Sequence, residues 1–193
     1  LSARYCPMGR ETGLTEVVWR DGWLWLKDGG LVPPLTAVGI GEALAQQRGR
    51  VAHDFTSQTL PDDFQWLRTP EPERLFTLTG AALRLHGRES IGSWFEQALV
   101  ARRQEDWSYD AETTLDFDPQ VYQQAAGLVT YYNRFKLHAC LVTDQPGMGR
   151  VLTLASCPGD YPDGKLRYLC PPLALEPGRV ALRVTVRGAA QQF

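Results

Sequence analysis

A charged segment near the start of the chain is the first place where chemistry is expected. It has the sequence Cys6-Pro-Met-Gly-Arg10-Glu11-Thr12 and precedes a strongly apolar stretch. An arginine fixed where a strand begins can direct its planar guanidinium at a ligand oxygen or a carboxylate. The alternative is a structural pair between Arg10 and Glu11 that closes a sheet. Arg10 is therefore a candidate ligand-binding residue, and the structural pair stays open beside it.

The acidic residues show no catalytic pattern. A glycosidase needs two carboxylates that flank the scissile bond, and a serine hydrolase needs a nucleophile with a histidine in reach. Asp62 and Asp63 follow a proline, and the acids of residues 106–118 alternate with apolar residues, so both groups are expected to face solvent. The Gly-X-Ser-X-Gly motif of a nucleophile elbow is missing. We expect no complete catalytic site in this chain.

Metal and cofactor sites are also not expected. The cysteines and the three histidines are scattered, without a Cys-X-X-Cys pair. Asp116-Phe-Asp118-Pro carries two carboxylates that calcium could use, but it lacks the dense oxygen spacing of calcium loops. Gly39-Ile-Gly41 lacks the third glycine and the βαβ unit of a dinucleotide site. The four cysteines, which are Cys6, Cys140, Cys157 and Cys170, are too far apart in sequence to suggest a metal site. We therefore predict no metal and no cofactor.

Composition excludes several classes of partner. The 193 residues carry a formal net charge of -2, so no basic field is present to neutralise nucleic acid or to hold an anionic membrane surface. No apolar run approaches the roughly 20 residues that span a bilayer, and no segment resembles a signal peptide. We expect a soluble, cytoplasmic protein.

The elements that must position these residues are predicted to be short strands. Residues 12–27 indicate a hairpin, because Asp21-Gly22 supplies the positive φ of a tight turn. Residues 107–117 alternate apolar and polar side chains, as a half-buried strand does. Many short strands with Gly/Pro turns and no interleaved helices favour an antiparallel β-sandwich. The further predicted strands are 75–78, 82–85, 95–101, 128–132, 137–142, 151–155 and 180–186.

Aromatic side chains leave a binding function open. The chain has six tryptophans and seven tyrosines, and a flat aromatic face can cover the C–H side of a sugar ring. The best candidate is the pair Tyr131-Tyr132, of which only one side chain can point outward in a strand. Aromatic residues are also ordinary sandwich core, and that alternative remains.

Several motifs resemble glycoside hydrolase family 43. Residues 6–12, followed by Val17-Val-Trp-Arg-Asp-Gly-Trp, resemble the end of that family's catalytic propeller. The segments His53-Asp-Phe to Thr69-Pro70, Leu83-Arg-Leu-His-Gly-Arg-Glu-Ser, Leu99-Val-Ala-Arg-Arg-Gln and Ala126-Gly-Leu-Val-Thr-Tyr-Tyr-Asn are similar to the C-terminal β-sandwich of its β-xylosidases. The motifs occur in the family's order along nearly the whole chain.

The resemblance implies a domain layout and a set of roles. It implies an all-β chain, with residues 1–30 as the last strands of a five-bladed propeller, 31–52 as a linker and 53–193 as a concanavalin A-like jelly roll, incomplete at its C-terminus. The family's catalytic aspartates and glutamate have no matching motif here, so no catalytic residue is assigned. Arg10 matches the arginine that reaches the bound sugar, and Cys6 would lie near the same pocket.

The implied function is hydrolysis in a longer protein. Such an enzyme releases xylose from short β-1,4-xylo-oligosaccharides with inversion, or acts on arabinofuranosides, and this chain alone would be inactive. The sandwich would brace the propeller and support contacts in a homo-oligomer. Two alternatives stay open: a non-catalytic carbohydrate-binding module, and a structural sandwich that serves oligomerisation.

Overall fold

The computed structural model describes residues 13–36 and 49–193, and these residues form an all-β structure. Within them the one helical element is a short 3-10 turn at Pro72–Arg74, and no helix is long and apolar enough to cross a membrane. The chain divides into two compact units, Leu1–His53 and Asp54–Phe193, each of which is described by itself.

The described part of the first unit contains the predicted hairpin. Strands β1 (Val17–Arg20) and β2 (Trp23–Leu26) pair antiparallel, with Arg20 opposite Trp23. Asp21 and Gly22 form the turn with φ values of 53° and 73°. Positive φ at both central residues is what a two-residue turn of matching twist requires, so the prediction from Asp-Gly is confirmed.

The hairpin carries an apolar surface that its own two strands do not cover. The side chains of Trp19 and Trp23 are 73% and 69% exposed, and Leu24 and Trp25 are also exposed. A two-stranded hairpin is marginally stable by itself in water, because it buries too little apolar area to offset the entropy of ordering. The hairpin residues are therefore of the kind that pack into a larger sheet.

The larger sheet of the second unit is built on three long strands joined in order. Strand β8 (Ala125–Asn133) pairs with β9 (Lys136–Gln145), and β9 pairs with β10 (Gly149–Cys157), all antiparallel. Two short strands, β11 (Arg167–Tyr168) and β12 (Leu173–Ala174), both pair with the outer side of β10. Sequential pairing of this kind needs only short hairpin turns.

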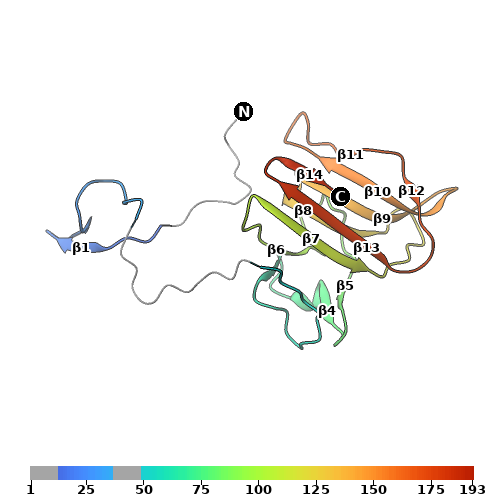
Figure 1. Ribbon diagram of the computed structural model, residues 1–193, viewed down its shortest axis with the longest axis horizontal. Helices are drawn as coiled ribbons and strands as arrows, with labels where there is room; N and C mark the ends of the chain where they lie inside the picture. The colour runs from blue at the N-terminus through green and yellow to red at the C-terminus, as the bar shows by residue number, and fades with distance from the viewer. Residues whose placement is uncertain (1–12, 37–48) are drawn as a thin grey trace. The chain divides into compact units, whose positions relative to one another are not determined.

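A second sheet lies against the first and completes the sandwich (Figure 1). It has the order β14–β13–β7, with β7 at Ser108–Leu115, β13 at Val180–Arg187 and β14 at Ala190–Gln192. Along β13 every second side chain is buried, while the intervening ones face outward. The buried ones are Leu182, Val184 and Val186. The two antiparallel sheets confirm the predicted sandwich, and β7 confirms the predicted half-buried strand, with Tyr109, Ala111 and Leu115 less exposed than their neighbours.

Arg150 on β10 ties the sandwich together through backbone carbonyls. Its Nε donates to the carbonyl of Phe117 at 3.2 Å and its Nη2 to that of Gly178 at 2.7 Å, and its Nη1 donates to Glu176. These carbonyls lie just after β7 and just before β13. One guanidinium therefore satisfies three acceptors in the chain segments that flank the second sheet.

Two short strand pairs precede the long strands. Strand β3 (Phe64–Trp66) pairs with β6 (Val100–Arg102), and β4 (Phe76–Leu78) pairs with β5 (Leu83–Leu85). The predicted strand at 95–101 is therefore mostly wrong, because only its end belongs to β6.

A buried glutamine explains that difference. Gln97 is 4% exposed, and its Nε2 donates to the carbonyls of Ser90, Ile91 and Ser93. A side chain thus supplies the donor that a neighbouring strand would otherwise supply, and residues 90–97 form an ordered loop. Apolar alternation cannot report such a contact.

Candidate functional site

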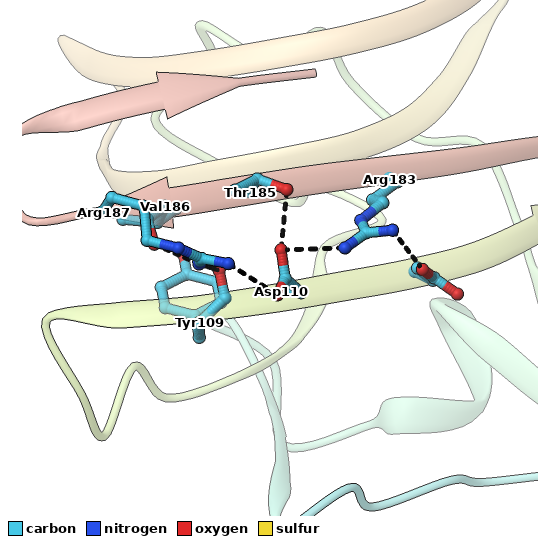
Figure 2. A network of polar contacts seen from close by, with 7 residues as sticks. Tyr109, Asp110, Arg183, Thr185, Val186 and Arg187 are labelled. Carbon is cyan, nitrogen blue, oxygen red and sulfur yellow. Dashed lines mark hydrogen bonds and ion pairs between the residues drawn. The ribbon is translucent and has the colours of Figure 1, made fainter.

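A cluster of polar side chains lies on the outward faces of β7 and β13, with Asp110 at its centre (Figure 2). Thr185 stands directly opposite Asp110 in the register and donates its hydroxyl to Asp110 Oδ1 at 2.6 Å. Arg187 Nη2 lies 2.9 Å from Asp110 Oδ2, and Arg183 Nη2 lies 3.2 Å from Oδ1. Three donors therefore converge on one carboxylate.

The cluster extends along both strands without leaving a charge unpaired. Arg183 Nη1 also meets Glu112 Oε1 at 3.3 Å, and Arg187 Nη1 donates to the backbone carbonyl of Tyr109 at 3.0 Å. We call Asp110, Glu112, Arg183, Thr185 and Arg187 the Asp110 network. Both carboxylates, Asp110 and Glu112, already pair with an arginine, so neither is available as a catalytic acid or base.

The electrostatics of the Asp110 network agree with a structural role. The hydroxyl of Thr185, followed by the guanidinium of Arg187, holds the pKa of the Asp110 carboxyl well below its usual range. A general acid of a glycosidase needs the opposite shift, toward neutrality. Asp110 therefore stays an anion and serves strand pairing between β7 and β13.

The stability that Asp110 gives should depend on pH in a defined sense. Its folded-state pKa is depressed, so its contribution is present above the unfolded value of about 3.9 and is lost as pH falls through the folded value. We expect Asp110→Asn to melt below the parent chain at pH 7, and this gap to narrow as the pH drops below about 4. The exposed Asp62 provides the control, and Asp62→Asn should leave the melting temperature nearly unchanged at both pH values. A gap for Asp110→Asn that stays constant from pH 7 to pH 3 would contradict this reading.

Two hydroxyl–histidine pairs look superficially like catalytic dyads. Ser156 Oγ lies 2.9 Å from His138 Nδ1, and Thr77 Oγ1 lies 2.8 Å from His86 Nε2. A nucleophile needs a base that a third group orients, and no carboxylate hydrogen-bonds either histidine among the described residues. Ser156 is also 5% exposed. Both pairs are therefore cross-strand contacts.

No metal site is found in the part of the chain that the structure describes. The carboxylates of the 116–118 segment have separate partners, because Asp116 faces Arg179 at 3.4 Å and Asp118 accepts from Gln120 at 3.2 Å. Among the described cysteines, Cys140 and Cys157 are buried and free. Burial raises the pKa of the Cys140 thiol, so it behaves as a small core residue.

The structure places some of the predicted site residues and omits others. Arg10 and Cys6 lie outside the described residues, as does most of the predicted linker, so their roles stay predictions. In the candidate sugar-stacking pair, Tyr131 is half-buried and donates its hydroxyl to Gln97 at 3.3 Å, while Tyr132 is 46% exposed. One tyrosine of the two thus faces outward, as the alternation predicts.

Sequence reasoning missed the basic half of the Asp110 network. The alternating acids of β7 were visible, but Arg183 and Arg187 come more than 70 residues later. Their alternation along 180–187, with both arginines on the polar side, was the available signal. It could pair them with β7 only once the strand register was known.

The chain matches a family model and is similar to known proteins. Residues 52–193 match the model of the β-xylosidase C-terminal concanavalin A-like domain. The chain is 43% identical to "Xylosidase/arabinosidase 43B" of Humicola insolens over 98% of its own length and 36% of that protein. It is 37% identical to a "Putative beta-xylosidase" of Escherichia coli K12, over 94% of this chain and 34% of that protein.

A solved structure gives the same result for the fold. The chain superposes on a xylan β-1,4-xylosidase from Bacillus halodurans C-125 with a TM-score of 0.80 and 30% sequence identity. The match covers 99% of this chain and 37% of that one. The chain thus spans about a third of the length of the relatives that it matches.

Proposed function

The chain belongs to the family of β-xylosidase C-terminal concanavalin A-like domains, and from this premise we propose that it works as part of a glycoside hydrolase. The proposed reaction is the release of xylose from short β-1,4-xylo-oligosaccharides with inversion. The acid and base would be supplied by a catalytic domain beyond the matched third. The observation that supports this most is the 43% identity to a xylosidase/arabinosidase along 98% of the chain.

The described residues support the proposal that the catalytic acid and base lie outside the matched third. The carboxylates of the Asp110 network face arginines, and the histidine–hydroxyl pairs lack an orienting carboxylate. The β1–β2 hairpin exposes Trp19 and Trp23, which a larger sheet would cover. We therefore assign the sandwich a bracing role. Arg10 remains the one residue proposed to touch the sugar, through its match to the family motif.

A domain exchange tests this proposal. In the hybrid, the matched C-terminal 36% of the Humicola insolens relative is replaced by this 193-residue chain. We expect the hybrid to hydrolyse xylobiose, whereas the same relative without any C-terminal part should lose activity because its hairpin and bracing sandwich are missing. A hybrid that folds, judged by a cooperative melt, but does not hydrolyse xylobiose would contradict the proposal.

The second candidate function is a carbohydrate-binding module. It is favoured by exposed aromatic side chains on the second unit, such as Tyr132 at 46% and Trp94 at 62% exposure. This alternative requires that the isolated chain bind neutral xylose or xylobiose. The hydrolase proposal expects no such binding, so a titration of the chain with xylobiose separates the two.

A further inference from the structure

One cavity of the second unit has a mostly apolar wall that contains a single charged residue. It measures about 250 Å³ and lies where β9 begins and β10 ends, between two loops. Its wall includes Ile91, Phe135, Leu137, Cys157 and Leu166. Arg134 is the one charged residue in the wall. None of these groups belongs to the Asp110 network.

The guanidinium of Arg134 is held in place by two aromatic rings. Its Cζ lies 3.9 Å from the ring centre of Trp94 and 4.4 Å from that of Phe135, and the two rings meet edge to face at 5.9 Å. Cation–π contacts of this kind fix the plane of the guanidinium. A fixed fork loses little conformational entropy when it binds a planar acceptor.

Arg134 lacks the anion that such a group normally meets. Its Nε is buried and has no hydrogen-bond partner among the described residues, and none of the ion pairs found there includes Arg134. Of the carboxylates in the two loops that contribute to the wall, Asp160 lies 2.6 Å from Lys136 and Asp163 lies 3.2 Å from Arg167, while Glu89 accepts from the hydroxyl of Ser93. A guanidinium without a counter-anion in a mostly apolar wall favours an anionic occupant, because a carboxylate that accepts from its terminal N–H groups would pair the charge.

The size and the wall of the cavity define what could bind. A carboxylate would accept from the Arg134 fork in a bidentate manner, because its two oxygens match the spacing of the N–H groups. About 250 Å³ corresponds to roughly eight water molecules, which is far more than a carboxylate needs and enough for a six-membered ring. The apolar wall suits the C–H face of such a ring, and the exposed indole of Trp94 stands beside Arg134.

We propose that this cavity is a binding site for a sugar acid, whose carboxylate pairs with Arg134 and whose ring packs on the apolar wall. The site lies on the sandwich and does not depend on the proposed hydrolase activity. It requires a negative charge on the ligand, which distinguishes it from a site for neutral xylo-oligosaccharides.

The test is a titration of the 193-residue chain with sodium D-glucuronate, followed by NMR of backbone amides and indole N–H groups. We expect saturable shifts at the Trp94 indole and at residues 90–92 and 164–166. D-xylose, which has a ring without the carboxylate, and acetate, which has the carboxylate without a ring, should each bind at least tenfold more weakly. Equal binding of xylose and glucuronate, no binding of glucuronate, or shifts confined to other regions would overturn the proposal.

Variants separate the site from general charge effects. Arg134→Met should weaken glucuronate binding at least tenfold, whereas Arg103→Met removes an equal charge from an exposed position and should leave binding unchanged. Arg134→Lys is made alongside, because it keeps the charge and a long stem but removes the fork. We expect it to bind several-fold more weakly than the parent chain even if Arg134→Met does not fold. Binding that Arg134→Lys leaves intact, or that Arg103→Met reduces as much as Arg134→Met does, would contradict the site.

Discussion

Replacing Gly127 with alanine is expected to lower the melting temperature of the sandwich strongly, because among the described glycines it has the closest backbone neighbours. Gly127 lies in β8 opposite Leu141 of β9. A Cβ built on Gly127 would meet the carbonyl oxygen of Cys140, and it would come within 2.9 Å of both Cys140 C and Leu141 Cα. All three atoms belong to the backbone, so no side-chain rotation can relieve the contact.

The expected cost of Gly127→Ala is about 3 kcal/mol or more, because strand β8, at the edge of the main sheet, would have to separate from β9. For a unit of this size that corresponds to a fall of roughly 10 °C in melting temperature. Gly87→Ala is the matched control, since a Cβ there meets nothing within 4 Å. It should change the stability by less than about 0.5 kcal/mol. Similar melting temperatures for the two variants would show that β8 and β9 are not packed as described.

The second large effect is expected on activity. Arg10→Ala, made in the hybrid enzyme, should reduce kcat/KM for xylobiose about 100-fold, which corresponds to roughly 3 kcal/mol of lost transition-state stabilisation. The physical reason is that the guanidinium holds the sugar ring in a fixed orientation when the substrate binds. The reaction then loses less entropy in aligning the ring, so its barrier is lower.

Arg20→Ala provides the comparison for Arg10→Ala. Arg20 lies at the exposed end of β1 in the same unit and is expected to have no contact with the sugar, so its removal should leave kcat/KM unchanged. If Arg10→Ala and Arg20→Ala gave the same kcat/KM, Arg10 would not be a substrate-binding residue and its match to the family motif would carry no function.

The fold could be predicted from sequence where local chemistry decides it. The positive φ that Asp21 and Gly22 favour predicts the first hairpin, and the alternation of residues 107–117 predicts β7 to within two residues at each end. Periodicity alone could not show that most of residues 95–101 form a loop and not a strand. The three hydrogen bonds from Gln97 replace strand pairing there, and a side-chain contact of this kind leaves no periodic pattern.

The candidate sites were less predictable because they depend on strand register and on loops. Asp110 is visible as one of several alternating acids, but its arginine partners are more than 70 residues away and become neighbours only through the pairing of β7 with β13. No pattern in the sequence predicts Arg134 as a binding residue. Its contact partner Trp94 lies 40 residues earlier in the sequence. Long-range contacts between polar side chains depend on the strand register and the loop conformation, and local periodicity reports neither.

The central claim is that this chain takes part in hydrolysis without supplying the acid or the base. The most direct measurement compares xylobiose hydrolysis by the purified 193-residue chain with that by the hybrid, at equal concentration and with both proteins shown to be folded. The claim predicts hydrolysis by the hybrid and a rate indistinguishable from buffer for the chain alone. Catalytic hydrolysis by the chain alone would contradict it, because a complete catalytic site would then lie within these 193 residues.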